Sequence, residues 1–334
     1  MSHTVTLSVC RTAFEVQDNE TILQAATRQG LNLPHSCQSG ICGQCKAELK
    51  SGDVAQGGHS EQALSAAEEA EGKILMCCAK IRSDVEIEIP GYQGDLPSVR
   101  VSPARVNRVE YRADTAVLGL TLPKAPRFEF LAGQYIDIQT KNGTRSYSIA
   151  SSSAESEHLE LHIRKREGGM FTGLLFGDEP AIQEKTVMRI RGPLGAFTLR
   201  LHQGEPLIFL ATGTGYAPVH SMLQQLAAQE NRPEIHLYWG GRTLNDLYYF
   251  NEARELCEQI GARFTPVLSR ARESWQGARG YVQQHALADY PDLSAHQVYA
   301  CGSAQMITAA QELLTGQGRL KKENFFSDIF TPAA

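Results

Sequence analysis

The chain has 334 residues, of which 42% are hydrophobic and 21% are charged, and its formal net charge is −5. This length is too great for one ordinary hydrophobic core and predicts two or three domains. No apolar run approaches the roughly 20 residues that span a bilayer, and residues 1–10 do not resemble a signal peptide. We therefore expect a cytoplasmic protein whose eight cysteines are metal ligands or catalytic thiols rather than disulfide partners.

Acidic residues are concentrated in the N-terminal third. Residues 1–95 contain 7 Lys and Arg against 13 Asp and Glu, a net charge of −6, whereas the remaining residues contain 25 against 24. This excess argues against nucleic-acid binding by the first part of the chain. Two interpretations stay open: the acidic surface steers a basic protein partner, or it keeps a small domain in solution.

The first predicted domain covers residues 1–95. Alternating segments within 4–16 predict strands, a helix is expected from Thr21, and residues 85–89 alternate again as a strand does. Residues 90–97 are rich in Pro and Gly, which is typical of a linker and predicts the domain boundary.

The second predicted domain covers residues 99–202 and reads as short strands separated by turns, with a helix at 171–176. Such spacing predicts an antiparallel barrel or sandwich. The clearest predicted strands are 115–121, 134–139, 145–150 and 159–165.

The third predicted domain covers residues 205–334, where strands and helices alternate. This alternation predicts a parallel sheet covered by helices, an architecture that binds nucleotides at the ends of its strands. The predicted strands are 207–211, 235–239, 264–268 and 298–300, and the predicted helices are 217–228, 246–260, 282–288 and 304–316.

The strongest local signal is a loop with Cys37, Cys42 and Cys45, followed by Cys77 thirty-two residues later. The spacing C-x4-C-x2-C with a distant fourth cysteine is the plant-type ferredoxin arrangement, in which four thiolates hold a [2Fe–2S] cluster. Zinc is the competing metal, but zinc ribbons usually present two separated pairs of cysteines. Four buried free thiols would be the purely structural alternative, and three cysteines within nine residues rarely all pack as core.

Glycines within this loop fit the same chemistry. Gly40 and Gly43 allow positive φ angles, so that backbone N–H groups can point at the sulfur atoms and tune the cluster. Cys77 and Cys78 are adjacent, so one of them is spare and is explained as a small core residue. Cys10 and Cys257 have no assigned chemistry.

A second group of residues suits a flavin. Arg145 offers a forked cation for a pyrophosphate, Tyr147 lies on the same strand face and can stack on a flat ring, and Ser148 can reach a ring nitrogen. Taken alone, R-x-Y-S is a weak signal. A downstream turn at the start of a predicted helix adds a phosphate site. The residues of that turn are Gly169, Met170 and Thr172.

A third group follows the first strand of the third domain. Gly213, Thr214 and Gly215 form a glycine turn that lets the backbone approach a pyrophosphate, and Pro218 suits the first turn of a helix. The pattern is not the G-x-G-x-x-G fingerprint and is weak alone. Arg242, after the second strand, is explained either as a ligand of a 2′-phosphate or as a solvated loop arginine, so the residues leave NADH and NADPH both open.

Two further candidate segments lie in the C-terminal part of the third predicted domain. Cys301 ends a predicted buried strand and is followed by Gly302; the purely structural interpretation is an inert core cysteine. Asp328 and Phe330 lie in an apolar C-terminal segment that a hydrophobic strand would explain almost as well.

In this order the three modules resemble the ferredoxin–NADP reductase superfamily, and in particular its three-domain [2Fe–2S] flavoprotein reductases of the benzoate dioxygenase type. The stretches 299–310 and 325–328 are similar to reductases of the CDP-6-deoxy-3,4-glucoseen type. The resemblance implies a plant-type ferredoxin (β-grasp) domain, an antiparallel FAD-binding barrel and a parallel-sheet NAD-binding domain.

The resemblance also implies roles for single residues. It implies Cys77 as the fourth cluster ligand and Ser148, Cys301 and Asp328 as residues that guide hydride from the nicotinamide to the flavin. It places Phe330 near the isoalloxazine and favours NADH over NADPH.

The implied function is an NAD(P)H-dependent oxidoreductase that passes electrons through FAD and the [2Fe–2S] cluster to a protein acceptor, either an oxygenase component or a deoxysugar dehydrase. FAD can accept two electrons as hydride and release them singly, as the cluster requires. Two alternatives stay open: a redox or nucleotide-sensing binding protein, and a flavin or quinone reductase without a protein partner.

Overall fold

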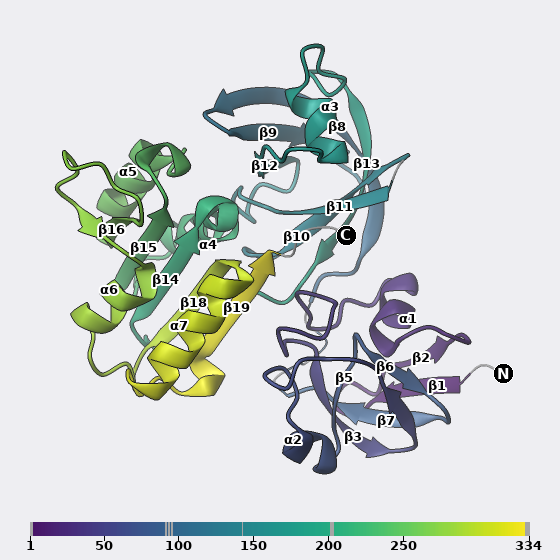
Figure 1. Cartoon of the computed structure of the whole chain (residues 1–334). Coiled ribbons are helices and arrows are strands. Elements are labelled where there is room, and N and C mark those ends of the chain that lie inside the picture. The colour runs from purple at the N-terminus through teal and green to yellow at the C-terminus, as the bar shows by residue number, and fades with distance from the viewer. Residues whose placement is uncertain are drawn as a thin grey trace. The chain divides into compact units, whose positions relative to one another are not determined.

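The computed structural model describes residues 3–90, 92, 94, 96–141, 143–200 and 204–330 (Figure 1). Three residues of the predicted linker, at 91, 93 and 95, lie outside the described residues. The chain forms two compact units. The first contains residues 1–100 and 192–197, and the second contains residues 101–191 and 198–334.

The first unit is a β-grasp fold, as predicted. Its main sheet has the order β2-β1-β7-β3-β5, with β1 antiparallel to β2 and parallel to β7. Helix α1 begins after Thr21, whose hydroxyl accepts from the Gln24 N–H while the Gln24 side chain accepts from the Thr21 N–H. The elements are β1 (His3–Leu7), β2 (Ala13–Val16), α1 (Ile22–Arg28), β3 (Lys46–Ser51), β4 (Val54–Gln56), α2 (Ala66–Ala70), β5 (Lys73–Leu75), β6 (Ala79–Ile81) and β7 (Val85–Glu88).

The second unit begins with a six-stranded sheet of order β11-β10-β13-β8-β9-β12. An antiparallel bridge between Ile149 and Leu161 joins its two edges, which closes the sheet into the predicted barrel. The elements are β8 (Arg100–Arg112), β9 (Thr115–Thr121), β10 (Tyr135–Thr140), β11 (Gly143–Ser148), β12 (His158–Arg164), α3 (Met170–Phe176) and β13 (Val187–Leu194).

The remaining part of this unit is a parallel sheet of order β17-β16-β15-β14-β18-β19. The order reverses at β14, so right-handed crossovers put α4 and α5 on one face and α6 and α7 on the other. The elements are β14 (Leu207–Thr212), α4 (Tyr216–Ala227), β15 (Ile235–Gly241), α5 (Phe250–Ile260), β16 (Arg263–Leu268), β17 (Ala278–Arg279), α6 (Val282–Asp289), β18 (Gln297–Ser303), α7 (Ala304–Gly316) and β19 (Phe325–Phe330).

Two differences from the sequence analysis have physical causes. Strand β8 was not predicted because its alternation is inverted: the small residues Ser102 and Ala104 are buried, whereas Val101 is 46% exposed. The helix predicted over 246–260 begins only at Phe250, because Asp246 closes a short 3-10 turn in front of it. Among the described residues, no helix is long and apolar enough to cross a membrane.

Candidate functional site

The four predicted cluster cysteines lie together in the first unit. The thiols of Cys37 and Cys42 are hydrogen-bonded to each other, which lowers the pKa of Cys37 to about 4. Cys45 and Cys77 form a second such pair, which raises the pKa of Cys77. The residues present therefore fit the predicted group, because soft sulfur donors from one loop and one distant residue converge as a [2Fe–2S] cluster needs.

Backbone amides point at these sulfur atoms. The Ser39 N–H donates to Cys37 Sγ at 3.4 Å, and the Gly40 N–H donates to Cys77. Gly40 has a φ of +73°, and a Cβ there would lie 2.9 Å from Cys78 Sγ and 3.0 Å from the Gly58 carbonyl oxygen. Only glycine fits this position, so the loop geometry depends on it.

The other cysteines are distributed differently. Cys78 Sγ lies 3.5 Å from Cys77 Sγ, so the structure leaves both near the predicted cluster. Cys257 is buried in α5, and Cys10 is half-buried beside the core of the first unit. All eight cysteines are free thiols.

The predicted flavin residues of the barrel lie on β11. Register places Arg145 opposite Ile138 and Tyr147 opposite Ile136, so that both side chains project from the same face. Arg145 makes no ion pair with a described carboxylate, and its Nη1 donates only to the Thr144 carbonyl at 2.8 Å. A guanidinium without a carboxylate partner beside a half-buried tyrosine fits a ligand that carries phosphate and a flat ring.

The downstream turn contacts the same tyrosine. The rings of Tyr147 and Phe171 have centroids 5.2 Å apart, which joins β11 to α3. Gly169 is the N-cap of α3, and Met170 is 43% exposed. The Thr172 hydroxyl donates to the Arg166 carbonyl at 3.0 Å, and this hydrogen bond stabilises the turn between the two residues.

The nucleotide turn packs tightly against a neighbouring strand. Residues 213–215 form a 3-10 turn after β14, and Pro218 lies in the first turn of α4. A Cβ on Gly215 would lie 2.2 Å from the Cys301 carbonyl oxygen, so only glycine allows this approach.

Two predicted catalytic residues lie side by side on paired strands. Cys301 on β18 is in register with Asp328 on β19, and the exposed fractions of the two residues are 0% and 6%. Burial, with the nearby Asp328 carboxylate, raises the pKa of Cys301, so the thiol stays protonated. Phe330 on β19 is in register with Ser303 on β18, two residues further along both strands.

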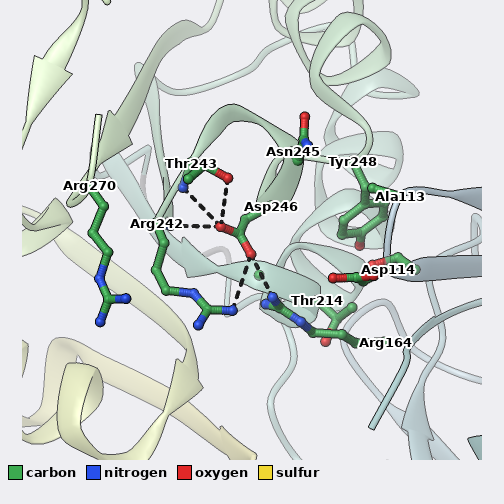
Figure 2. Close-up of a pocket in the computed structure, with 12 residues that line it drawn as sticks. Ala113, Asp114, Arg164, Thr214, Arg242, Thr243, Asn245, Asp246, Tyr248 and Arg270 are labelled. Atoms are coloured by element: carbon green, nitrogen blue, oxygen red, sulfur yellow. Dashed lines mark hydrogen bonds and ion pairs between the residues drawn. The ribbon is translucent and has the colours of Figure 1, made fainter. Parts of the chain in front are cut away.

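A cavity of about 540 Å³ opens at the ends of β14 and β15 (Figure 2). Asp246 accepts from the N–H groups of Arg242 and Thr243 at 3.0 and 2.9 Å, and Arg164 Nη2 from the barrel donates to it at 2.5 Å. Burial alone would raise the pKa of Asp246, but the Thr243 amide and Arg164 outweigh it and lower that pKa. Residues 113–115, Gly213, Thr214 and Arg270 also line this cavity. We call it the coenzyme pocket because the sequence analysis expects the nucleotide at Gly213 and Thr214.

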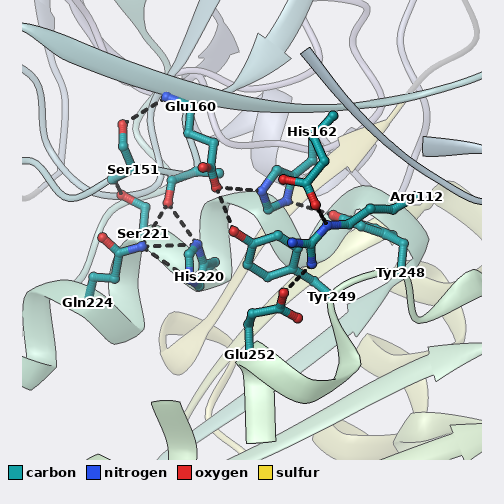
Figure 3. Close-up of polar contacts among 12 residues, drawn as sticks. Arg112, Ser151, Glu160, His162, His220, Ser221, Gln224, Tyr248, Tyr249 and Glu252 are labelled. Carbon is teal, nitrogen blue, oxygen red and sulfur yellow. Dashed lines mark hydrogen bonds and ion pairs between the residues drawn. The ribbon is translucent and has the colours of Figure 1, made fainter. Parts of the chain in front are cut away.

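Beside this pocket the barrel and the parallel sheet share a buried polar junction, formed by residues 150–151 and 160–162 of the barrel with residues 220–224 and 248–249 of the sheet (Figure 3). On α4, His220 Nδ1 donates to the Ala150 carbonyl at 3.1 Å and Ser221 Oγ donates to the Ser151 carbonyl at 2.6 Å. These carbonyls lie just after β11, so helix α4 is bonded to the segment that follows the strand of the predicted flavin residues.

Glu160 lies at the centre of the junction. It accepts from His162 Nε2 at 2.9 Å, and His162 Nδ1 lies 2.7 Å from the Tyr248 hydroxyl. Burial works to raise the pKa of Glu160, but the hydrogen bond from His162 and nearby positive groups lower it to about 2. Burial, with repulsion from His162, lowers the pKa of His220 to about 4. The junction therefore holds one carboxylate and a neutral His220 at neutral pH.

The ring nitrogens and carboxylate oxygens of Glu160, His162 and His220 lie within 4.8 Å of one another. Because both nitrogens of His162 are already hydrogen-bonded, we interpret the group as a protein network rather than a metal site. None of these residues stood out in the sequence. Asp246 had a detectable signal: T-x-x-D after a strand is the pattern of a capping box.

Comparison with known proteins agrees with this geometry. Family models match residues 7–82 as a 2Fe-2S iron-sulfur cluster binding domain, residues 105–199 as an oxidoreductase FAD-binding domain and residues 209–312 as an oxidoreductase NAD-binding domain. CDP-6-deoxy-L-threo-D-glycero-4-hexulose-3-dehydrase reductase of Yersinia pestis is 37% identical over all of both chains.

Two further similarities extend over nearly the whole chain. Phenol hydroxylase P5 protein of Acinetobacter pittii is 36% identical over 100% of this chain and 96% of its own. The crystal structure of Amycolatopsis cytochrome P450 reductase GcoB is 31% identical, with a TM-score of 0.82 over 99% of this chain and 100% of that one.

Proposed function

The chain belongs to the iron–sulfur flavoprotein reductases of the ferredoxin–NADP reductase superfamily, and we propose that its acceptor is a separate dehydrase or oxygenase component. It is an NAD(P)H-dependent oxidoreductase that uses FAD and a [2Fe–2S] cluster. The observation that carries the acceptor proposal is the full-length similarity to two proteins, one named as the reductase of a dehydrase and one as the P5 protein of phenol hydroxylase. The eight free cysteines support a reducing compartment, and we propose the cytoplasm.

Bound FAD supplies the conversion between one hydride and two single electrons. For this chemistry we assign Arg145 to the flavin pyrophosphate, and we assign Tyr147 and Phe330 to the flavin ring. Ser148 lies at the end of β11, 6% exposed, and we assign it to the ring nitrogen that receives hydride.

On the other side of the reaction, Gly213, Thr214 and Gly215 would face the nucleotide pyrophosphate, with Pro218 setting the helix direction. We assign Cys301 and Gly302 to the nicotinamide side. Burial keeps the Cys301 thiol protonated, so it presents no charge there, and we assign the adjacent Asp328 as a second polar group on the same side.

We assign Cys37, Cys42, Cys45 and Cys77 as the ligands of the cluster. We assign Gly169, Met170 and Thr172 to the turn that binds the flavin phosphates. Ile41, in the middle of the cysteine loop, is 43% exposed. Cys37 and Cys42 in this loop are half-buried rather than buried, and we propose the loop as the surface that meets the protein acceptor.

The test uses the holoprotein under anaerobic conditions. Mixing with NADH or NADPH should bleach the flavin absorbance, and a one-electron acceptor such as cytochrome c should then be reduced. Cys77→Ser should abolish cytochrome c reduction while flavin bleaching survives. Cys78→Ser is the matched control and should keep both activities.

The outcomes separate the alternatives. Absence of flavin bleaching with either nucleotide would favour a sensor. Undiminished cytochrome c reduction by Cys77→Ser would remove the cluster from the electron path. The acceptor is then identified by reconstitution, in which a purified dehydrase or oxygenase component turns over only when this chain and nucleotide are both present.

A further inference from the structure

The end of strand β13 belongs to a different unit from the rest of that strand. Residues 101–191 are part of the second unit, whereas residues 192–197 are part of the first. All six residues of this short segment are buried. We call residues 192–197 the coupling arm, because the chain enters it directly from the FAD-binding barrel and the arm belongs to the unit of the cluster cysteines.

The coupling arm lies beside the segment that leads into the first cluster cysteine. The Ala196 N–H donates to the His35 carbonyl at 3.0 Å, and Asn32 Nδ2 donates to the Pro193 carbonyl at 3.3 Å. The two contacts are three residues apart in both segments, so the segments run alongside each other in the same direction. His35 lies two residues before Cys37, so the arm contacts the chain immediately in front of the first ligand.

Asn32 holds two connections at once. It is 2% exposed, and its side-chain amide also donates to the Pro97 carbonyl at 3.1 Å. Its Oδ1 has no hydrogen-bond partner among the described residues. Burying an amide oxygen without a partner opposes folding, and a leucine of similar size would avoid that cost. The amide is therefore explained by its two donated hydrogen bonds, one to the end of the linker and one to the coupling arm.

The barrel holds the chain at the other end of the arm. Arg191, the residue in front of the arm, donates from Nη2 to Asp137 Oδ2 on β10 at 2.8 Å. Asp137 Oδ1 accepts from the Ser146 hydroxyl at 2.6 Å. Ser146 lies on β11 between Arg145 and Tyr147, which we assigned to the flavin. Polar contacts therefore connect the strand of the flavin residues to the start of the coupling arm.

We propose that Asn32 is a positioning residue for electron transfer, and that the rate at which electrons pass from flavin to cluster depends on the coupling arm that it holds. The inference rests on the proposed function, because it concerns the step between the two cofactors named there. In each such step one electron leaves the flavin and enters the cluster. Electron transfer weakens steeply with distance, so this step requires a fixed connection, whereas hydride transfer to the flavin does not involve the arm.

The first test measures the arm without turnover. Asn32→Leu removes both donated hydrogen bonds and leaves two carbonyls without a donor. Hydrogen–deuterium exchange of the holoprotein, read by mass spectrometry in peptides that cover residues 192–199, should be at least about tenfold faster at the Ala196 amide. Tyr92→Phe is the matched control, because the Tyr92 hydroxyl donates to the Asn32 carbonyl at 3.2 Å and does not contact the arm. This variant should keep wild-type exchange.

The second test separates the two transfer steps by anaerobic stopped flow with NADH or NADPH. In Asn32→Leu the flavin should be reduced at the wild-type rate, and reduction of the cluster, followed by its own visible absorbance, should be about tenfold slower. Iron and flavin contents equal to those of the wild type show that the variant is folded. Tyr92→Phe should keep both rates.

The outcomes distinguish this inference from the proposed function. Wild-type cluster reduction in Asn32→Leu, despite faster exchange, would overturn this inference alone. Equal slowing in Tyr92→Phe would assign the effect to the first unit as a whole and would also overturn it. Absence of flavin bleaching in the wild type would overturn the proposed function, and this inference with it.

Arg191→Gln tests the arm from the barrel side and decides the matter if Asn32→Leu does not fold. Loss of the ion pair with Asp137 should slow cluster reduction and leave flavin reduction unchanged, and Arg191→Lys, which keeps the charge, should restore most of the rate. Arg189→Gln, exposed on the same strand, removes an equal charge and should change neither rate. Equal slowing in Arg189→Gln and Arg191→Gln would mean that charge, not position, controls the step, and would overturn the inference.

Discussion

The cysteine loop and the polar junction hold reactive groups in place by different means. In the loop, three of the four sulfur donors lie within nine residues, and backbone N–H groups of the same segment point at them. In the junction, partners come from distant parts of the chain, such as His162 with Tyr248, 86 residues apart. The loop is therefore specified by local backbone geometry, and the junction by how two folded layers pack.

This difference predicts different responses to substitution. A change in the loop should abolish one cofactor and leave the rest of the chain folded. A change in the junction should weaken the whole second unit without affecting the cluster. The following predictions test that contrast, from the largest expected effect to the smallest.

The largest effect is expected from Gly40→Ala. A Cβ at this position meets a sulfur and a carbonyl oxygen within 3.0 Å, and the positive φ adds about 1–2 kcal/mol of strain. We expect nearly complete loss of iron, measured as iron per flavin, with flavin content unchanged. Gly58→Ala is the control, because a Cβ at Gly58 meets nothing within 4 Å. Equal iron content in the two variants would contradict local specification of the loop.

The next effect is expected from Glu160→Gln. The substitution keeps the shape but removes a buried charge that His162 and Arg108 contact, at a cost of about 3 kcal/mol. Flavin release, followed by fluorescence during heating, should shift to lower temperature, whereas bleaching of the cluster should not. Glu157→Gln on the barrel surface, whose carboxylate is 3.8 Å from Lys124, should change neither transition. A shift of both transitions in Glu160→Gln would mean that the two regions do not respond separately.

Acid should weaken the junction. The pKa of His220 is lowered to about 4 in the fold, so between pH 6.5 and 4 the unfolded chain binds a proton that the folded chain does not. Stability must then fall as pH falls through this window, by at most about 3 kcal/mol. Urea unfolding followed by flavin fluorescence at pH 7.5 and 5 measures this loss.

His220→Gln should reduce the loss of stability between pH 7.5 and 5 but not abolish it, because burial also lowers the pKa of His236 to about 4. An unchanged pH dependence in His220→Gln would show that another group controls the acid response of the second unit.

The smallest effect concerns the acidic surplus of residues 1–95. If this surface steers a basic partner, added salt should slow reduction of cytochrome c about threefold at moderate ionic strength. Glu69→Gln with Glu71→Gln, both on the exposed surface of the first unit, should flatten the salt dependence. Glu179→Gln with Glu184→Gln on the barrel removes the same charge and should not. Equal slopes in the two double variants would leave solubility as the explanation of the acidic residues.

Local patterns in the sequence were sufficient for much of the fold. The strand predicted at 115–121 has those bounds in the structure, and the helix predicted at 304–316 has its bounds as well. The strand is a short continuous buried run, and the helix buries one apolar face at helical spacing, so both gave a clear signal. Strand β8 gave a weaker signal because two of its three buried residues, Ser102 and Ala104, are small, whereas Val101 is exposed.

The residues of the candidate site also divide into those with a local sequence signal and those brought together only by tertiary packing. The cysteine spacing and the two glycine turns are local features, so the sequence alone indicated them. Glu160 and His162 are two residues apart on β12, but neither has a function until α4 and residues 248–249 pack against them. Such pairs are set by tertiary packing, and a single sequence contains no local signal for them.

Arg164 has a practical consequence for engineering. It belongs to the barrel, yet it lines the coenzyme pocket together with residues 113–115 and neutralises Asp246 of the parallel-sheet domain. A chimera that exchanged only the parallel-sheet domain between two such reductases would thus transplant half of a recognition surface. Transfer of coenzyme choice would require the donor's residues at 113–115 and 164 to travel with the domain.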